Sequence, residues 1–378
     1  MSLISPARRA FFADVAAWVG RQADASIVIT HLLPQRGEFL EALHRIAPIA
    51  LVIPVPYSVH PPTLDEVAAR YAVARPSLDE MLDPQHMSAL IAPYLGGGPT
   101  ALIEIGGYFA SALDLLKARY GARILGCLED TEAGHRRYDA AAPLPYPVVS
   151  VARSRLKQAE DALVGPSCVF SAERLLKGQG LYLHARRALV LGYGKVGRGA
   201  ARALDGRDAP TSVFDVNPVQ RALAMSEGFP IPEREAALAN ADIVFGCTGT
   251  TSVGPDELGL LKSGAILVSC SSKRVEFDVA TLERDYARTP VAPHIDAYAK
   301  AGQTLYLLGG GAPLNFLDGG IGGPALSLVQ AEIMAAVKTL AAAPAGGAVA
   351  EVDAATRQHL AAMWCRAFSD PETGAYRL

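Results

Sequence analysis

Short hydrophobic runs alternate with amphipathic stretches along the first half of the chain. The apolar runs predict strands at 25–33, 49–55, 100–107 and 122–130. Amphipathic patterns predict helices at 5–20, 35–46, 63–73, 109–119 and 154–177. Strands that alternate with helices are typical of a parallel sheet covered on both faces.

A second alternating series begins near residue 188. It predicts strands at 188–191, 211–215, 242–246, 265–269 and 304–308, and helices at 195–204, 218–227 and 256–261. A chain of 378 residues is also long enough for two hydrophobic cores. The fold class predicted is therefore α/β, with two doubly wound parallel-sheet domains.

Composition excludes several partners. Half of the residues are hydrophobic and the formal charge is −3 with no basic stripe, so neither nucleic acid nor an anionic membrane is an expected partner. Five cysteines without a CxxC pair favour reduced thiols in the cytoplasm and no metal site. The first 20 residues do not have the pattern of a signal peptide, and IAPIALVIPVPY is too short and too rich in proline to span a bilayer.

The segment LVLGYGKVGRGAARAL is the strongest motif in the chain. Gly192, Gly194 and Gly197 follow a predicted strand and open a predicted helix, the pattern of a Rossmann dinucleotide-binding loop. Lys195 and Val196 begin the helix whose N-terminus would face the pyrophosphate. Asp215 ends the next strand, where a carboxylate binds a ribose 2′-hydroxyl and repels a 2′-phosphate, so NAD is favoured over NADP. The alternative is a tight turn that binds no ligand.

With these motifs in order, the chain resembles the adenosylhomocysteinase family from about residue 25 to 335. The resemblance rests on HLLPQRGEFLEAL, LIEIGG, LEDTEAGHRRY, GYGKVGRGAARAL, VFDVNPVQRALAMSEGF, CTGT, VEFDV and LLGGGAPLNF. It implies a substrate domain over 1–182, an NAD-binding Rossmann domain over 183–312, a return to the substrate domain over 313–345 and a tail over 346–378. A homo-oligomer is expected.

The resemblance also implies a chemistry and a set of residues. Bound NAD oxidises a ribose 3′-hydroxyl, homocysteine is eliminated from C5′, water adds, and the ketone is reduced. Lys157 and Asp161 match a lysine and its partner aspartate, at i and i+4 on one helix face; the alternative is an ordinary surface pair. His31 matches a histidine that handles the leaving group and the water, or is a structural residue.

Further positions take their roles from the same resemblance. Asp130 stands where a glutamate lies near the ribose hydroxyls. Asn315 matches a contact to the nicotinamide amide, and Thr248 lies in a matching cofactor loop. Glu104 is expected to contact substrate.

Departures from the family fall in the elimination and base-reading machinery. An aspartate proposed as the 4′ base is Ile105, and the two residues that read adenine are Leu33 and Gln35, which are expected to bind substrate. Other family residues are replaced by Ala162, by Ser272 and, in a Gly-His-Pro motif that becomes Gly322-Gly323-Pro324, by Gly323. The C-terminal lysine and tyrosine that reach a neighbour's NAD are Glu372 and Leu378. Glutamine both donates and accepts hydrogen bonds, so Gln35 favours another nucleobase or a modified nucleoside. Three functions stay open: an enzyme that oxidises a nucleoside 3′-hydroxyl, with or without chemistry at C5′; a true adenosylhomocysteinase; and a silent NAD-binding regulator.

Overall fold

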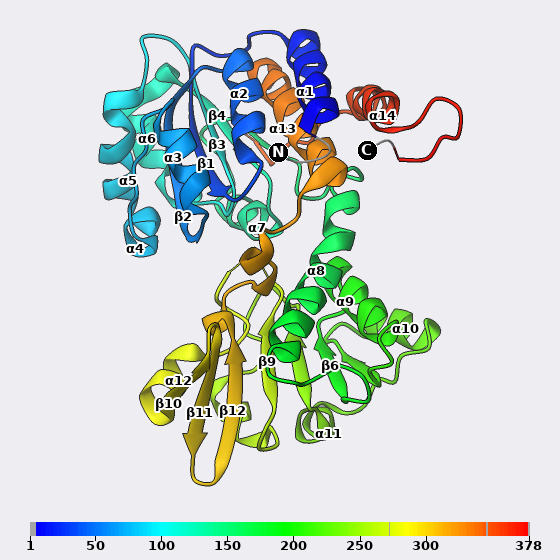
Figure 1. Ribbon diagram of the computed structural model, residues 1–378. Coiled ribbons are helices and arrows are strands. Elements are labelled where there is room, and N and C mark those ends of the chain that lie inside the picture. Colours follow the sequence, from blue (N-terminus) through cyan, green and yellow to red (C-terminus); the bar gives the residue numbers. More distant parts are fainter. Residues whose placement is uncertain (1–4, 272, 345–346, 377–378) are drawn as a thin grey trace. The chain divides into compact units, whose positions relative to one another are not determined.

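The chain forms two compact units, each built on its own sheet (Figure 1). A computed structural model describes residues 5–271, 273–344 and 347–376. Unit 1 comprises Met1–Ala159 and Gly322–Leu378, and unit 2 comprises Glu160–Ile321. Both sheets are mainly parallel, which confirms the predicted α/β class.

The sheet of unit 1 has five parallel strands in the order β2-β1-β3-β4-β5. Their bounds are β1 Ala25–Leu32, β2 Ile49–Val59, β3 Thr100–Glu104, β4 Ile124–Glu129 and β5 Val148–Ser150. The first four lie where hydrophobic runs predicted them, and the three-residue β5 was not predicted. This order is the doubly wound one that reverses direction between β1 and β3, and ligands of such sheets bind at the carboxyl edge of the reversal.

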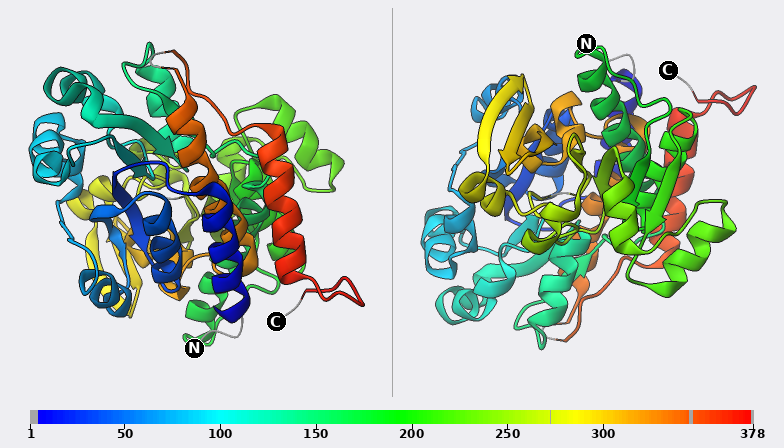
Figure 2. Two further views of the ribbon diagram at one scale, coloured as in Figure 1. Left: turned by 90° about the horizontal axis from the view of Figure 1, so that it is seen from above. Right: turned by 90° about the horizontal axis from the view of Figure 1, so that it is seen from below.

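Alternate residues of each strand enter two different cores. Val28 of β1 packs on one face, whereas Ile27 and Ile29 pack on the other. The first face is covered by α1 (Ser5–Val19), α2 (Arg36–Ile46), α3 (Pro61–Ala68), α13 (Gly323–Ala342) and α14 (Ala354–Phe368). The second is covered by α4 (Leu78–Leu82), α5 (Pro84–Ile91), α6 (Leu113–Tyr120) and Tyr138 of α7 (Glu132–Ala140). Figure 1 and the left view of Figure 2 both show α1, α13 and α14 side by side.

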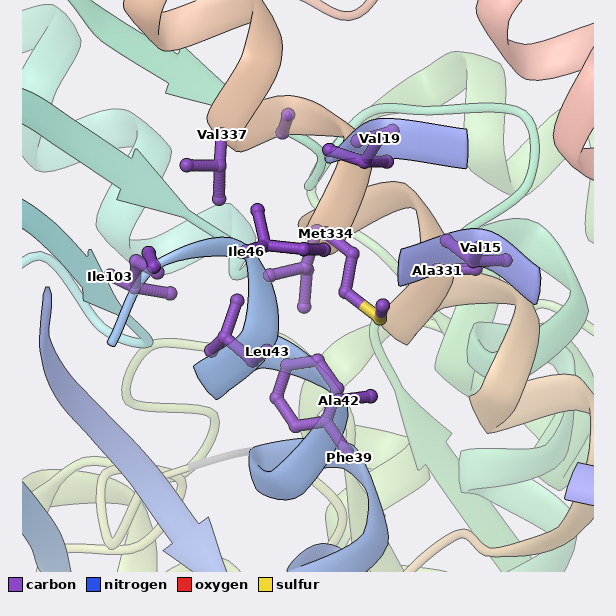
Figure 3. Packing of buried hydrophobic residues seen from close by; sticks show 14 of the residues in the cluster. Val15, Val19, Phe39, Ala42, Leu43, Ile46, Ile103, Ala331, Met334 and Val337 are labelled. Carbon is purple, nitrogen blue, oxygen red and sulfur yellow. The ribbon is translucent and has the colours of Figure 1, made fainter. Parts of the chain in front are cut away.

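Helix α13 is the centre of the first core. Among the described residues it is the one helix long and apolar enough to span a membrane, but 78% of its apolar window is buried inside the protein. Figure 3 shows Met334 of α13 among side chains of α1 and α2, including Val15 and Phe39. We therefore assign α13 as a core helix; its continuous apolar pattern gives no amphipathic signal, and the sequence did not predict it.

The sheet of unit 2 has seven strands in the order β10-β11-β12-β9-β8-β6-β7. Its strands are β6 Ala188–Leu191, β7 Thr211–Phe214, β8 Ile243–Gly246, β9 Ile266–Ser269, β10 Ala287–Ala292, β11 Ile295–Lys300 and β12 Gln303–Leu308. β10 to β12 form an antiparallel meander that joins the parallel strands through β12 and β9. β10 is exposed along most of its length, so it carries no hydrophobic run and was not predicted.

Three helices of unit 2, α8 to α10, lie close to predicted ones, and α11 and α12 were not predicted. They are α8 (Gln158–Lys177, which begins at the boundary with unit 1), α9 (Lys195–Asp205), α10 (Pro218–Ser226), α11 (Arg234–Asn240) and α12 (Val279–Asp285). The segment predicted as a helix at 256–261 is a 3₁₀ turn over Pro255–Leu260. α8 begins four residues later than the predicted start at 154, which places Lys157 outside it.

The unit boundaries differ from those predicted. The first lies at residues 159 and 160 rather than 182 and 183, because α8 packs its buried side chains into a core of unit 2. The second lies at residues 321 and 322 rather than 312 and 313. The predicted tail is not separate, since Leu360 and Phe368 of α14 are buried in the core of unit 1.

Truncating Met334 to alanine should destabilise the protein strongly. Its side chain is fully buried, so Met334→Ala leaves a cavity and should lower the free energy of unfolding by about 2–5 kcal/mol. Met225→Ala makes the same change at a side chain that is 66% exposed and should cost less than about 0.5 kcal/mol. Urea unfolding followed by circular dichroism measures both, and equal effects would contradict the assigned core.

Candidate functional site

The glycine loop of unit 2 has the backbone geometry of a dinucleotide site. Gly192 follows β6 with φ +90°, a conformation that other residues rarely adopt. A Cβ atom on Gly197 would collide with the Gly192 carbonyl, so the first turn of α9 closes directly on the strand. A Cβ on Gly194 would meet nothing within 4 Å, so the backbone is open to a ligand there.

Asp215 is fixed beside this loop. Its carboxylate accepts hydrogen bonds from the backbone N–H of Tyr193 at 2.6 Å and of Asn217 at 2.8 Å. The carboxylate therefore stands next to the loop where the motif predicts the ribose acceptor. Gly194 caps α9 without a side chain, so the N–H groups of Lys195 and Val196 point out of the helix end.

A buried carboxylate that the sequence did not single out holds the next loop. Glu276 is fully buried, accepts the Gly249 N–H at 2.7 Å, and lies 2.8 Å from the hydroxyl of Thr248. Burial raises the pKa of Glu276. Thr248 therefore shapes the loop after β8, and the motif VEFDV, which contains Glu276, is the sequence signal for this contact.

Asn315 supplies an unsatisfied acceptor in unit 2. The residue is 3% exposed, and its Oδ1 has no hydrogen-bond partner among the described residues. A buried amide oxygen without a donor is costly, and a ligand amide N–H would satisfy it. The unsatisfied Asn315 oxygen, the open glycine loop and the Asp215 carboxylate together are suited to binding NAD.

In unit 1 the candidate site lies at the carboxyl ends of β1 and β2. Nδ1 of His31 is hydrogen-bonded to the hydroxyl of Ser58, which itself donates to the Val55 carbonyl at 3.1 Å. Ser58 has one hydroxyl proton and donates it to Val55, so in the contact with His31 the hydroxyl oxygen must accept. Nδ1 of His31 is therefore the protonated nitrogen, and Nε2 carries the lone pair. No motif or spacing in the sequence pointed to Ser58.

His31 is a neutral imidazole at physiological pH. Burial lowers its pKa to about 3, and the positive charges of Arg36 and Lys157 contribute in the same direction. The effect of Lys157 also places that residue near His31. A neutral histidine can accept a proton or orient a water, as the family resemblance implies, but it does not enter the reaction as a cation.

Lys157 is paired differently from the prediction. Its Nζ lies 3.0 Å from Oδ1 of Asp130, and both side chains are largely buried. Asp161 instead binds Lys195 at 2.8 Å within unit 2. The predicted Lys157–Asp161 pair on one helix face is therefore wrong, because α8 begins only at Gln158 and Lys157 precedes it.

Two glutamates shape the loops around this site. Glu129 accepts backbone N–H groups of Gly106 at 3.0 Å and Gly107 at 2.8 Å, and Glu104 accepts those of Tyr108 and Phe109. Burial raises the pKa of both carboxyl groups. Glu104 is 1% exposed and also accepts a hydrogen bond from the Tyr138 hydroxyl of α7, so its oxygens bind groups of unit 1, and its expected contact with substrate stays a prediction.

Several positions that differ from the family pattern hold side chains that are buried or hydrogen-bonded within unit 1. Leu33 is buried, and Ile105 lies in the hydrophobic core behind β3. Gln35, in a left-handed conformation with φ 71°, accepts hydrogen bonds from Arg8 and from the Gly323 N–H. Ser272 and Leu378 lie outside the described residues.

Comparison with known proteins places the glycine loop of unit 2 in a known domain family. Residues 172–319 match the family model described as S-adenosyl-L-homocysteine hydrolase, NAD binding domain. Adenosylhomocysteinase of Aeropyrum pernix is 28% identical over 263 residues, which cover 68% of this chain and 63%, less than two thirds, of that protein. Residues 172–319 therefore form an NAD-binding domain of the adenosylhomocysteinase type, and the chain is similar to adenosylhomocysteinase. The family match lies over the glycine loop, Asp215, Glu276 and Asn315, so it covers the candidate cofactor residues.

Solved structures that resemble the chain are more distant. One subunit of dipicolinate synthase from Bacillus halodurans has a TM-score of 0.45 and 14% identity, and the match covers 86% of this chain and 100% of that one. The pyruvate reductase of Chlamydomonas reinhardtii has a TM-score of 0.39 and 17% identity, covering 70% and 73% of the two chains.

Replacing Asp215 tests the cofactor site. Asp215→Ala removes the carboxylate beside the glycine loop, so NAD should bind about 10- to 100-fold more weakly and its advantage over NADP should shrink. Calorimetry with both dinucleotides measures the change, and Asp256→Ala, at an exposed position, serves as the control. Unchanged selectivity for NAD would remove Asp215 from the site.

Proposed function

We propose that this chain is an NAD-dependent enzyme that oxidises the ribose 3′-hydroxyl of a nucleoside. The observation that carries the proposal is the buried Lys157–Asp130 ion pair beside the neutral His31 in unit 1, in a family whose cofactor domain unit 2 shares. Unit 2 would bind the cofactor through the glycine loop, Asp215 and Asn315. NAD, when bound, accepts a hydride.

Lys157 and Asp130 would remove the hydroxyl proton. Once Lys157 Nζ has lost its own proton, it would accept the proton of the 3′-hydroxyl, and the Asp130 carboxylate 3.0 Å away would stabilise the ammonium that forms again. Because both side chains are largely shielded from water, the attraction between them is stronger than at the surface. His31 lies near Lys157 and would act on the C5′ side of the ribose, where the family places its leaving group.

The second candidate is hydrolysis of S-adenosylhomocysteine, and the similarity to adenosylhomocysteinase favours it. Against it stands Ile105, which occupies the position of the family's proposed 4′ base and packs in the hydrophobic core. An isoleucine side chain cannot accept a proton. A protein that binds NAD without turnover is a third candidate, and the first experiment below distinguishes it from the other two.

Lys157→Ala should abolish the oxidation. Incubating the wild-type protein with NAD and nucleosides should produce the absorbance of bound NADH, and losing the proton acceptor should slow its appearance about 10²- to 10⁴-fold. Lys177→Ala, an exposed lysine near the end of α8, is the matched control and should behave as wild type. Absorbance that survives intact in Lys157→Ala would exclude Lys157 from the mechanism, and absorbance absent from wild type with every nucleoside would favour the silent binding protein.

Release of homocysteine separates the oxidoreductase from the hydrolase. Because the position of the 4′ base is filled by Ile105, homocysteine should be released from S-adenosylhomocysteine at least about 10²-fold more slowly than by a family enzyme assayed in parallel. A thiol reagent follows the release over many turnovers. A rate equal to that of the family enzyme would overturn the oxidoreductase proposal in favour of the hydrolase.

A further inference from the structure

A row of four polar side chains extends from His31 along the carboxyl edge of the unit 1 sheet. The rings of His31 and Tyr57 are 6.1 Å apart, Tyr57 donates a hydrogen bond to the Tyr108 hydroxyl, and the guanidinium carbon of Arg137 lies 5.7 Å from the centre of the Tyr108 ring. The four residues come from β1, from β2, from the loop after β3 and from α7. They meet where the strand order reverses, the usual ligand position of such a sheet.

The guanidinium of Arg137 has N–H donors in this row that a ligand can use. Its Nη1 donates to the Gly106 carbonyl at 3.1 Å, and it makes no ion pair with any carboxylate in the described part of the chain. A guanidinium carries five N–H donors in a planar fork that matches the two oxygens of a carboxylate or phosphate. The neighbouring Arg136 differs, since it is exposed and bound to Glu132 at 3.0 Å.

The charges around the row favour an anion. Arg36 and Lys157 both act on His31, and Asp130 balances the charge of Lys157. Two carboxyl groups lie close to Arg137 in the fold, Glu104 and Glu129, but burial raises the pKa of both, which disfavours their negatively charged forms. Ile105, at the position of a family aspartate, adds no negative charge.

We propose that Arg137, with the hydroxyl group of Tyr108, binds an anionic oxygen group of the substrate, a carboxylate or a phosphate attached on the C5′ side of the nucleoside. This inference rests on the proposed function, which places the 3′-hydroxyl at Lys157 and Asp130 and the C5′ side at His31. The row begins at His31 and ends at Arg137, so a substituent on C5′ is the part of the substrate that meets the guanidinium.

Calorimetry on the full-length protein tests the assignment with three probes: adenosine, adenosine 5′-monophosphate and adenosine 5′-carboxylic acid. At least one anionic probe should bind the wild-type protein about 10- to 100-fold more tightly than adenosine, because charge-assisted bidentate hydrogen bonds are strong. The anionic probe with the larger gain identifies phosphate or carboxylate as the group bound. The gain should fall with added salt.

Variants at neighbouring positions complete the test. Arg137→Gln should bring the anionic probes within about 3-fold of adenosine, Arg137→Lys should keep part of the gain, and Arg136→Gln should keep all of it. Thermal unfolding checks that Arg137→Gln remains folded, and Arg137→Lys supplies the comparison if it does not. No gain in wild type, or a gain unchanged in Arg137→Gln and in Arg137→Lys, would overturn the inference.

The same samples separate this inference from the proposed function. Bound NADH formed with adenosine, without any preference for the anionic probes, would refute the Arg137 assignment and leave the oxidation supported. An Arg137-dependent preference without NADH from any probe would support the anion site and refute the oxidation.

Discussion

The carboxylate of Glu129 is the contact on which the loops at the carboxyl edge of the unit 1 sheet depend. It receives five hydrogen bonds, from the backbone N–H groups of Gly106, Gly107, Asp130 and Thr131 and from the Thr131 hydroxyl. These donors belong to the loops after β3 and β4, so one side chain fixes the geometry of both. A Cβ on Gly134 would collide with this carboxylate, which explains why α7 carries glycine where it passes Glu129.

Fixing these loops determines where the chemistry can occur. The Glu129 contacts hold the backbone of Asp130, whose side chain binds Lys157, and Thr131 caps α7 through the Gly134 N–H, which orients the helix that carries Arg137. Unit 2 has the same type of contact, a carboxylate that accepts backbone N–H groups of a loop. Glu276 holds the loop after β8 in this way, and Asp215 holds the glycine loop. Parallel sheets leave backbone donors at their carboxyl edge, and a buried carboxylate satisfies several of them at once. Burial makes each charge costly, and the backbone donors favour its ionised form.

The sequence predicted the parts of the fold that produce a periodic signal. Buried strands such as β1 and β6 are continuous apolar runs, and the glycine loop has a fixed spacing. The prediction missed β10, whose residues are exposed, and α13, whose apolar side chains have no polar face to give a period. It also missed Glu129 and Glu276, because an acidic residue that accepts backbone N–H groups looks in sequence like any solvated carboxylate.

The pairing of Lys157 shows why spacing alone cannot assign an ion pair. Four residues separate Lys157 from Asp161, but each finds a closer partner in its own unit, Asp130 for the lysine and Lys195 for the aspartate. The lysine thereby joins the unit 1 loops that Glu129 fixes, whereas the aspartate, which lies on α8, binds the first residue of α9 in unit 2. Loss of Asp161 would consequently remove a negative charge beside the glycine loop, whereas loss of Asp130 would remove one beside Lys157. Residues that neighbour one another in the chain thus join two separate networks of contacts, and the boundary between the units passes between them.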